Sequence, residues 1–572
     1  MLMPIKTILK FYDGDAGIAV GELPEEDKSK LAKFVTNSDD NIFAWKIGDS
    51  FTPEQAGALL SRYSRTSFTG RELLLKEFLP NSNRGREFFE SWLVDYGDDS
   101  IQEMAGGIPA SCEFVSNLLA KVIEDGRFAS YIEKSTRYVA FDKKLPDGSY
   151  MFYKDKEIME SRFADEYIEL MNGLFDSYSK HMEEMVKYIG DMNPLVEQKF
   201  RIGDALIGYA EFDSKSEERL GISAKDLQRA YANSVKANAL DLMRDYLPMA
   251  TLTHVGISAN ARAYEALMLK LLASELSEAR HVGNRLYEEL YKVVPSLVKR
   301  VRDVHGKEFV SFLHARDSSI SEEVAKINLS SNGLGSSSLI DYTGIGTENP
   351  DQKASANVVG AVLYRFGHGI SLSDAIAAAE KMDKAQREAL ISKYVGIRKN
   401  RRHRPGRAFE NVEYLFDFIG RIGIYRDLQR HRVGTQERQN FTVDYGYDTR
   451  KEYESIGIAE DYRSKMSGII DLYGKLRDKF PMQAQYVVTF GFKTRWYYRM
   501  NARELYHMVE LRTTPSGHPD YRRLMQDSFK MAAAVHPSIT KYMSFVDMSD
   551  KQLGRLGAEI RIAQKHNALK SA

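Results

Sequence analysis

The stretch RHRVGTQERQNFT at residues 430–442 is an incomplete copy of RFASYIEKSTRY at residues 127–138. Superposed at Arg432 and Arg127, the two combine into one longer pattern, R-H-R-x-x-S-x-x-x-x-S-x-R-Y. The first copy has the later serine, arginine and tyrosine but lacks Arg-His at its start. The second copy starts with Arg-His-Arg but lacks the later serine and arginine. The chain therefore contains a duplication whose two copies have diverged in complementary ways.

A second landmark repeats in the same order. Asn260-Ala-Arg262 returns as Asn501-Ala-Arg503, and an apolar pattern typical of a helix follows each copy. Two repeats do not make a solenoid, so we expect two related domains. The predicted first domain covers residues 1–325 and the second covers 346–572. A Ser/Gly-rich linker at 326–345 joins them.

The copies differ in length. Asn260 follows Arg127 by 133 residues, whereas Asn501 follows Arg432 by only 69. The first domain is therefore expected to carry an insertion of roughly 64 residues. We place it at about 142–215.

Composition favours a soluble, multidomain, globular protein. The chain has 572 residues, of which 43% are hydrophobic and 28% charged. Lys+Arg and Asp+Glu both number 80, so no bulk charge indicates a nucleic-acid partner. A single cysteine, Cys112, suits a reducing compartment. Because neither a signal peptide nor a run of eighteen apolar residues is seen, we expect a cytoplasmic protein without membrane partners.

Further blocks resemble a known family. The block at 96–103, YGDDSIQE, is similar to Y-G-H-x-S-x-x-E, and residues 404–410 look like its counterpart in the second half. The block at 501–512 matches N-x-R-x-x-x-H-x-x-x-x-R at every marked place. Together with the divided R-H-R pattern, these blocks resemble the flavin-dependent thymidylate synthases. The resemblance implies an α+β fold in two tandem copies, each with helices and a small antiparallel sheet.

The resemblance also implies an activity, the conversion of dUMP to dTMP. In that family methylenetetrahydrofolate donates the carbon, FAD reduced by NADPH supplies hydride, and no enzyme nucleophile is needed. Cys112 is therefore expected to be a small packed residue. Family members are homotetramers with active sites built across subunit boundaries. Two tandem chains are thus expected to form a homodimer that mimics one tetramer.

Carried over place by place, the resemblance implies site residues in both halves. Arginine suits a nucleotide phosphate because its planar fork matches two oxygens at once. A cation beside the pyrimidine carbonyls would stabilise negative charge in the reaction. The expected dUMP residues are Glu133, Ser135, Arg137, Arg244, Arg430 and Arg512, of which Arg512 and Arg430 are also the catalytic candidates. The expected FAD residues are Arg430, His431, Arg432, Asn501, Arg503, His507, Ser100, Glu103 and Glu410.

The losses are complementary, which implies one complete pocket per chain made from unlike halves. The opposite pocket would use residues that have lost the family's side chains and is expected to be inactive. These residues are Asp125, Gly126, Leu271, Asn440 and Thr442.

Alternatives remain open at this stage. Asp98 stands where the family has histidine, and Thr435 replaces a serine. A non-catalytic or repurposed flavin- or nucleotide-binding protein of the same fold fits that difference. A second alternative is an RNA-binding or assembly protein that uses the basic run at 398–407. Asn501 could equally be a helix cap. No histidine spacing typical of a metal site is present, so no metal is predicted.

Overall fold

The computed structural model describes the chain except for residues 1–7, 12–18, 23, 39, 49, 52, 82–106, 146–147, 203–204, 294–297, 328, 330–336, 551–552 and 572. The chain forms two compact units. The first unit is Met1–Ser330, Thr442–Phe492 and Leu556–Ala572. The second unit is Ser331–Phe441 and Lys493–Arg555. The first unit therefore contains part of the second repeat as well as the first repeat, and the units differ from the two consecutive domains expected from the sequence.

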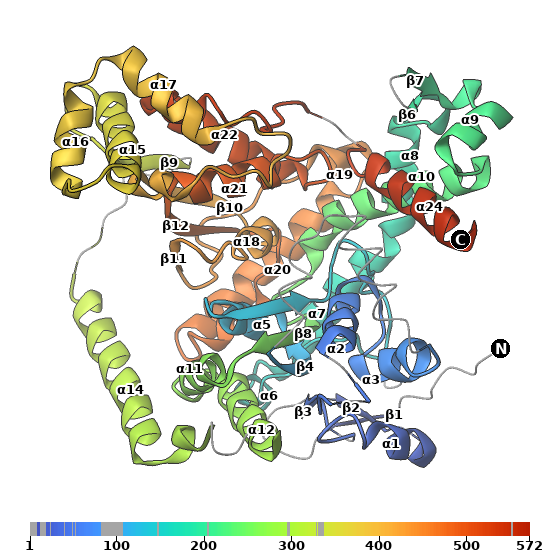
Figure 1. The fold of residues 1–572 in the computed structure, drawn as a ribbon. Coiled ribbons are helices and arrows are strands. Elements are labelled where there is room, and N and C mark those ends of the chain that lie inside the picture. Colours follow the sequence, from blue (N-terminus) through green and yellow to red (C-terminus); the bar gives the residue numbers. More distant parts are fainter. Residues whose placement is uncertain are drawn as a thin grey trace. The chain divides into compact units, whose positions relative to one another are not determined.

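The first unit holds most of the helices (Figure 1). Its elements are β1 (Ile8–Phe11), β2 (Ala19–Glu22), α1 (Glu25–Leu31), β3 (Ile42–Ala44), α2 (Pro53–Arg62), η1 (Tyr63–Arg65), α3 (Gly70–Leu73), η2 (Leu74–Phe78), β4 (Ile108–Ser116), α5 (Asn117–Glu124), β5 (Ala129–Glu133), α6 (Lys156–Met159), α7 (Ala164–Lys180), α8 (Met182–Met192), η5 (Leu195–Glu197), β6 (Lys199–Ile202), β7 (Ala205–Gly208), η6 (Tyr209–Glu211), α9 (Ser214–Leu220), α10 (Ala224–Met243), η7 (Arg244–Tyr246), β8 (Leu252–Ala259), α11 (Ala261–Leu272), α12 (Ser277–Val293), η8 (Lys299–Arg302), α14 (Val304–Ala325), α19 (Lys451–Ser455), α20 (Ala459–Arg477), η10 (Gln483–Val487) and α24 (Leu556–Ser571).

The second unit is smaller. Its elements are β9 (Ser338–Tyr342), α15 (Pro350–Phe366), α16 (Leu372–Lys381), α17 (Lys384–Val395), η9 (Arg407–Asn411), β10 (Glu413–Arg421), α18 (Ile422–Leu428), β11 (Thr435–Arg438), β12 (Lys493–Asn501), α21 (Ala502–Arg512), α22 (Pro519–Val535) and α23 (Pro537–Thr540).

Each unit contains one four-stranded antiparallel sheet, and the two sheets share their strand order. The first runs β3-β4-β8-β5 and the second runs β9-β10-β12-β11, which is the same order written in equivalent strands. The helices that follow equivalent strands also correspond, since α5, α11 and α12 match α18, α21 and α22 in sequence order. The expected mixture of helices with small antiparallel sheets is therefore confirmed, in two copies.

The two sheets are buried to different extents. Every residue of β8 is buried, so helices and loops cover both faces of that strand. In β12 the buried residues alternate, with Thr494, Trp496, Tyr498 and Met500 facing the core. An alternating strand has one covered and one open face. The second sheet thus keeps a less covered face.

The Asn-Ala-Arg landmark starts a helix in both repeats. The Asn260 side chain accepts a hydrogen bond from Ala263 N at the start of α11, and Asn501 accepts one from Glu504 N at the start of α21. Capping of this kind satisfies one of the amide groups that a helix start leaves without an intrahelical partner. The helix-cap interpretation of Asn501 is therefore confirmed.

The helices indicate where the first repeat has its extra residues. The short α6 and the long α7 of the first repeat correspond to α19 and α20 of the second repeat, a pair of similar length and spacing. Most of the added length then lies after α7, in the segment that contains α8, the β6-β7 hairpin, α9 and α10. This is later in the chain than the 142–215 expected from the sequence.

One short apolar run behaves differently from its sequence pattern. Residues 486–490, YVVTF, have strand-like composition, but Gln483–Val487 form a 3-10 helix. Beyond that helix, Thr489 makes a single antiparallel bridge with Pro248. The segment pairs with another loop instead of joining a sheet.

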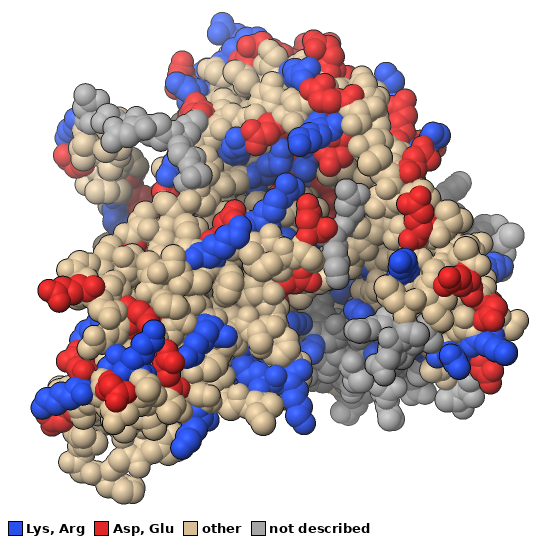
Figure 2. Space-filling view, turned by 90° about the horizontal axis from the view of Figure 1, so that it is seen from above, with Lys and Arg blue, Asp and Glu red and all other residues tan. Residues whose placement is uncertain are grey.

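The surface and the helices agree with the balanced composition. On the face shown in Figure 2, basic and acidic side chains are interspersed among the described residues. In the part of the chain that the structure describes, no helix combines the length and the apolar character required to cross a bilayer.

A carboxyl group lies inside the first unit. Glu278 of α12 is fully buried and accepts hydrogen bonds from Ser116 N at 2.7 Å, Ser116 Oγ at 2.6 Å and the Tyr486 hydroxyl at 2.9 Å. Burial raises the pKa of Glu278 from 4.5 to about 7, although these hydrogen bonds oppose the rise. The folded state therefore holds this proton more tightly than the unfolded state does.

The raised pKa of Glu278 makes stability depend on pH. Its contribution is full below pH 4.5 and is lost as pH rises to about 7, a loss of about 3 kcal/mol. We expect Glu278→Gln to remove this slope and to raise the free energy of unfolding at pH 8 much more than at pH 5. Chemical denaturation at pH 5 and pH 8 measures the free energy of unfolding of both proteins. The exposed Glu275→Gln is the control, and an equal effect of Glu278→Gln at both pH values would contradict the assignment.

Candidate functional site

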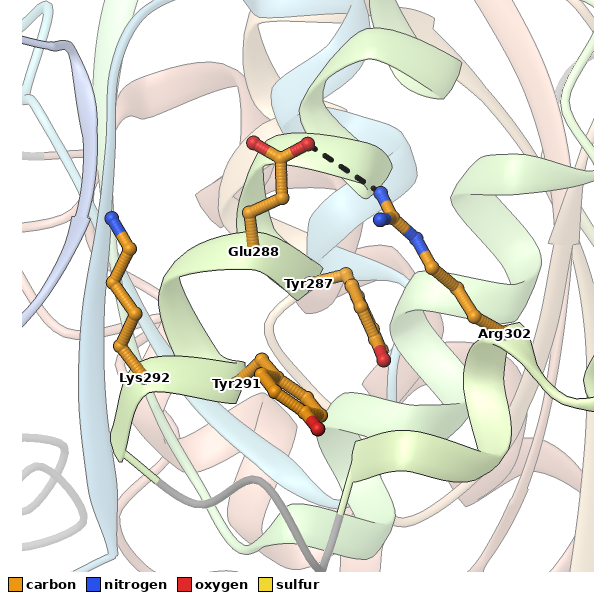
Figure 3. A pocket seen from close by; sticks show the side chains of 5 residues that line it. All are labelled: Tyr287, Glu288, Tyr291, Lys292 and Arg302. Carbon is orange, nitrogen blue, oxygen red and sulfur yellow. Dashed lines mark ion pairs between the residues drawn. The ribbon is translucent and has the colours of Figure 1, made fainter.

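The cavity seen in Figure 3 is not where the predicted residues gather. It measures about 520 Å3 and is lined by Tyr287, Glu288, Tyr291 and Lys292 of α12 together with Arg302 of η8. The Arg302 guanidinium already has two partners, because it lies 3.6 Å from the Glu288 carboxylate and 4.3 Å from the centre of the Tyr287 ring. None of the expected dUMP or FAD residues that the structure describes lines this cavity.

The Arg-His-Arg loop lies between α18 and β11 and is held by the sheet. The Tyr498 hydroxyl of β12 donates to the His431 carbonyl at 3.0 Å, and Gly434 N donates back to that hydroxyl at 3.2 Å. Gln436 Nε2 also donates to the His431 carbonyl, at 3.1 Å. A Cβ atom on Gly434 would lie 2.0 Å from the Tyr498 ring, so only glycine allows the loop to approach β12 this closely.

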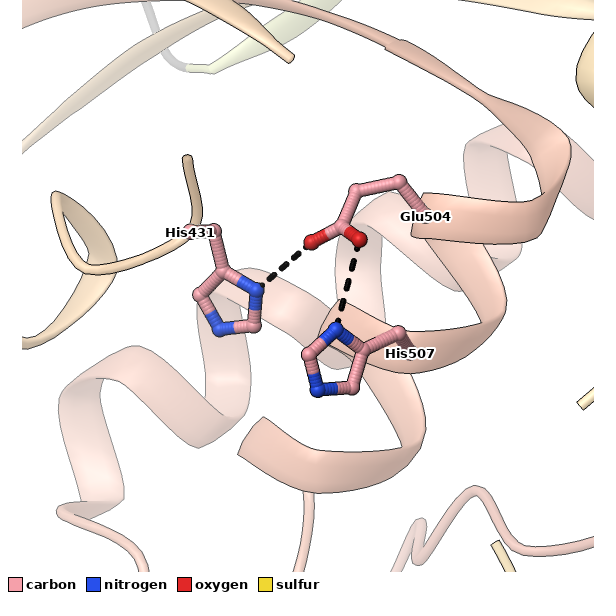
Figure 4. Close-up of side chains that lie close together, drawn as sticks. All are labelled: His431, Glu504 and His507. Carbon is pink, nitrogen blue, oxygen red and sulfur yellow. Dashed lines mark hydrogen bonds and ion pairs between the residues drawn. The ribbon is translucent and has the colours of Figure 1, made fainter. Parts of the chain in front are cut away.

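His431 points into a buried cluster with two residues of α21 (Figure 4). Its Nδ1 lies 2.8 Å from Glu504 Oε1, and His507 Nδ1 lies 3.3 Å from the other oxygen, Glu504 Oε2. Glu504 and His507 are three residues apart and therefore share one face of the helix. One carboxylate thus orients both imidazoles.

Arg512 fixes the proton on His431. Its Nε lies 2.9 Å from His431 Nε2, and a guanidinium N–H can only donate. His431 Nε2 must therefore accept, which places the proton of the neutral ring on Nδ1, where it is donated to Glu504. Arg512 therefore donates to His431, and His431 and His507 both donate to the Glu504 carboxylate. The four side chains form one hydrogen-bond network with fixed donors and acceptors.

The same cluster has the composition of a metal site. His431, Glu504 and His507 offer three ligand atoms within 4.8 Å of one another. A metal on His431 Nδ1 would require that nitrogen to be deprotonated, and Nε2 would then carry the proton and oppose the Arg512 N–H. The observed donors favour a hydrogen-bond network over metal ligation.

Burial and neighbouring charges keep the cluster in one protonation state. Burial, reinforced by the Arg512 charge, lowers the pKa of His431 from 6.5 to about 4, although Glu504 opposes this. Burial alone would raise the pKa of Glu504, but hydrogen bonds from His431 and His507 outweigh it and lower that pKa from 4.5 to about 2. At neutral pH His431 is therefore uncharged and Glu504 is a carboxylate.

The remaining predicted FAD residues of the second unit lie on or beside α21, η9 and the Arg-His-Arg loop. Arg503, at the start of α21, donates to the Pro405 carbonyl at 2.9 Å and lies 3.4 Å from Glu410 of η9. The structure thus brings two of the predicted residues, Arg503 and Glu410, into one ion pair. Arg430 is exposed and Arg432 is half-buried, one on each side of the buried His431.

The predicted dUMP residues of the first repeat gather on a carboxylate that the sequence analysis missed. Arg137 Nε and Nη2 donate to the two oxygens of Asp241 at 2.7 and 2.8 Å. Arg244 Nη1 lies 4.0 Å from the same carboxylate, and Ser135 Oγ accepts from Arg137 N at 3.2 Å. A bidentate pair fixes the plane of a guanidinium. Asp241 thus holds Arg137 beside Arg244, and Ser135 joins the group through the backbone of Arg137.

Glu133 is placed differently from its neighbours. It ends β5, is fully buried and lies 3.0 Å from the buried ammonium of Lys121, which also contacts Glu124. A buried carboxylate needs such a partner. The role of Glu133 in binding dUMP stays a prediction.

Two predicted residues, Ser100 and Glu103, lie outside the described residues, as does Asp98. Of the residues expected in an inactive second pocket, Asp125 pairs with Lys270 at 3.0 Å and Leu271 is buried. Both side chains have structural partners within the first unit.

The basic run that favoured an RNA-binding alternative is not uniformly solvated. Arg398 donates to Glu510 Oε1 and to the Tyr542 carbonyl, both at 2.7 Å, and only 4% of its side chain is exposed. Its guanidinium also lies over the rings of Tyr506 and Phe545. Arg398 therefore stabilises the second unit.

Sequence reasoning missed Glu504, Asp241 and Tyr498. Two of the three had a local signal. Glu504 lies three residues before His507, and Asp241 lies three residues before Arg244, so helical spacing places each beside a predicted residue. Tyr498 had no such signal, because it meets the loop only through strand pairing.

We expect Glu504→Gln to weaken the cluster. The glutamine amide of the variant can accept a hydrogen bond from one imidazole only, and its own N–H points toward the other imidazole. The variant therefore loses the free energy of unfolding that the lowered Glu504 pKa supplies, about 3 kcal/mol at pH 7. That stability is present above pH 4.5 and is lost as pH falls toward 2, so the difference between wild type and variant should shrink in acid. Denaturation curves measure this.

Nitrogen-15 NMR of labelled histidine adds a readout that general destabilisation would not move. The variant should keep the proton of His431 on Nδ1, because Arg512 still donates to Nε2, but the Nδ1 resonance should shift as its acceptor changes from a carboxylate to an amide. The exposed Glu437→Gln control should match wild type. An unchanged Nδ1 resonance together with unchanged stability would contradict the network.

The comparisons with known proteins agree with a duplicated chain. The family model described as thymidylate synthase complementing protein matches residues 49–296 and again 338–538. A UPF0159 protein of Chlamydia pneumoniae is 34% identical over 554 residues, covering 94% of this chain and 97% of the relative. A UPF0159 protein of Thermoplasma acidophilum is 32% identical over 517 residues, covering 88% and 98%.

Among solved structures, a UMP/dUMP methylase, PolB from Streptomyces cacaoi bound with 5-Br dUMP, is 19% identical with a TM-score of 0.27. It covers 36% of this chain and 93% of its own, and a similarity at that level carries no argument. The family match spans most of both repeats, in the two regions where the sheet order recurs. The chain belongs to the thymidylate synthase complementing protein family.

Proposed function

We propose that this protein is a flavin-dependent thymidylate synthase. It would convert dUMP to dTMP, with methylenetetrahydrofolate as carbon donor and NADPH-reduced FAD as hydride source. Family membership supports this activity. The observation that carries it is the Arg512 guanidinium, anchored through Nε on a neutral, buried His431 beside the Arg-His-Arg loop.

Arg512 has the properties that activation of a pyrimidine requires. Carbon 5 of uracil becomes nucleophilic when negative charge at the ring carbonyls is stabilised, and a fixed cation does this without reorganising. Anchoring through Nε restricts the plane of the guanidinium. Because His431 is uncharged at neutral pH, it orients Arg512 without repelling it. Arg430 supplies a second cation from the same loop as His431.

The second unit also offers a donor set that fits FAD. Arg430, Arg432 and Arg503 are cations suited to a diphosphate, and the imidazole of His507 suits the polar edge of a planar ring. His431, whose two ring nitrogens are already bonded, would act on the flavin through the residues it positions. Asn501 and Glu410 complete the proposed set, with Ser100 and Glu103 carried over by resemblance. When bound, the reduced flavin supplies hydride, and the residues of this chain hold and orient it.

The first repeat would supply the dUMP phosphate site. Arg137, Arg244 and Ser135 are the donors, and Asp241 orients the Arg137 guanidinium and lies 4.0 Å from that of Arg244. Each repeat lacks the groups that the other retains, so we infer one complete pocket per chain built from unlike halves. The protein should then bind one FAD per chain and form a homodimer that resembles a tetramer of single-repeat subunits.

The decisive experiment follows tritium release from 5-labelled dUMP with NADPH and methylenetetrahydrofolate. We expect Arg512→Lys to lower kcat by about 100-fold or more, because lysine lacks the Nε–H that docks on His431. The bound flavin, measured from its absorption spectrum, should stay near one per chain. Arg495→Lys, which alters an arginine of the second unit that pairs with Asp417 and not with His431, is the matched control and should keep both activity and flavin.

Other outcomes assign the protein elsewhere. Flavin without tritium release would identify a flavin-binding protein of the same fold, the alternative that Asp98 favours. A colourless protein that binds RNA would favour the assembly alternative. Full activity in Arg512→Lys would show that Arg512 is not the activating cation.

A further inference from the structure

Two loops of the first unit pair with each other in a symmetrical way. Residues 245–250 of the first repeat correspond to 486–491 of the second, because both stretches keep the same distance to the Asn-Ala-Arg landmark. Met249 N donates to the Val488 carbonyl at 2.8 Å, and its counterpart Phe490 N donates to the Leu247 carbonyl at 2.9 Å. Exchanging each residue for its counterpart in the other repeat turns one hydrogen bond into the other.

The next pair of hydrogen bonds repeats this exchange. Ala250 N donates to the Tyr486 carbonyl at 2.9 Å, and its counterpart Gly491 N donates to the Asp245 carbonyl at 3.2 Å. Between the two pairs, Pro248 bridges its own counterpart, Thr489. A residue can face its own counterpart only where a local twofold axis passes. This is the contact pattern of an isologous dimer interface.

The neighbouring helices follow the same axis. The corresponding helices α7 and α20 pack on each other. A Cβ atom on Gly468 would lie 3.3 Å from Leu170, and a Cβ on its counterpart Gly173 would lie 3.0 Å from Lys465, the counterpart of Leu170. The contacts of the helices are thus also reciprocal. We call these two helices and the two paired loops the junction.

The junction is symmetrical in shape but not in charge. Arg450, in the cap position of α19, pairs with buried Asp245, its Nε donating at 2.6 Å. The corresponding cap position of α6 holds Asp155, and the counterpart of Asp245 is Tyr486. The segment around Asp155 does face Tyr486, since the Tyr153 and Tyr486 ring centres are 5.1 Å apart. One half of the junction therefore has an ion pair, and the other has an acid near a tyrosine.

This asymmetry disfavours pairing between like repeats. If two first repeats met about the same axis, buried Asp155 would face Asp245, and two carboxylates would repel each other. If two second repeats met, buried Arg450 would face Tyr486 and lose its carboxylate. Only a first repeat facing a second repeat places the cation opposite the acid.

We infer that the junction is a heterospecific interaction surface. The surface of the first repeat that carries α7 and Asp245 accepts the segment Thr442–Phe492 of the second repeat of the same chain, and the Asp245–Arg450 pair enforces that choice. The duplicated chain has converted a self-complementary dimer contact into one that recognises its own other half. This inference does not depend on the proposed enzymatic function.

Crosslinking of the full-length chain tests which halves meet. The variant Leu170→Cys with Gly468→Cys places two thiols on opposite sides of the junction, where a short bis-maleimide bridges them. We expect a link within one chain, seen as a monomer on a denaturing gel and as a joined peptide pair after proteolysis. The single variants Leu170→Cys and Gly468→Cys are the controls. Cys112, the one native cysteine, is buried, and burial raises its pKa to about 12, so its background reaction is low.

The single variants decide specificity. Like repeats paired about the same axis would bring two copies of position 170, or of 468, close together in separate chains. Covalent dimers from either single variant, at a yield similar to the intrachain link of the double variant, would overturn the inference. Absence of the intrachain link would overturn it as well.

A double-mutant cycle tests the enforcing pair. Asp245→Asn and Arg450→Met should each lower the folding equilibrium constant by about 100-fold or more, because each leaves a buried charge without its partner. The loss of folding free energy in the combined variant should be smaller than the sum of the losses in the two single variants. The exposed junction pair Glu166–Lys475, changed to Glu166→Gln and Lys475→Met, is the control and should cost about fivefold or less.

Additive costs, or costs no larger than those of the control pair, would show that Asp245–Arg450 does not select the partner. The conservative Asp245→Asn keeps the side-chain shape, so it is informative even if Arg450→Met folds poorly.

Discussion

The backbone hydrogen bonds around Pro248 and Thr489 are the contact on which the organisation of the first unit depends. Residues 245–250 and 486–491 are all buried, and buried amide and carbonyl groups need partners. The backbone amide and carbonyl groups of each loop form hydrogen bonds with those of the other. Burying either loop without the other would leave these groups without partners and would cost free energy. This explains why Thr442–Phe492 belongs to the first unit although it follows the start of the second repeat. The compact units therefore differ from the sequence repeats, because the strongest packing of this segment is with the opposite repeat.

A second constraint organises the candidate site. Asn501 caps α21 and places Glu504 in its first turn, where the helix dipole favours a carboxylate. Glu504 then accepts from His431 and His507, and His431 accepts from Arg512. One short block, residues 501–512, thus supplies the cap, the acid, one imidazole and the guanidinium. The loop at 430–434 contributes only the central ring, held in place by β12.

The two constraints have different physical origins. At the junction, shape is shared by both repeats and charge is not, so packing provides the affinity and the buried ion pair provides the choice of partner. In the site, burial and hydrogen-bond direction act together. Burial keeps His431 neutral, and the obligatory donor of Arg512 selects its tautomer. Both cases use a buried polar group whose only satisfied arrangement is the native one.

The sequence by itself determined the duplication and the mixture of helices with small antiparallel sheets, because repeated patterns and helical spacing are local properties. Asn501 as a cap, and His507 with Arg512 on one helix, follow from spacing alone. The roles of Asp241 and Glu504, the tight approach of Gly434 to Tyr498, and the pairing of Asp245 with Arg450 were decided only by the tertiary structure. Each joins residues from separate elements, and a buried charge finds its partner through packing that no local pattern records.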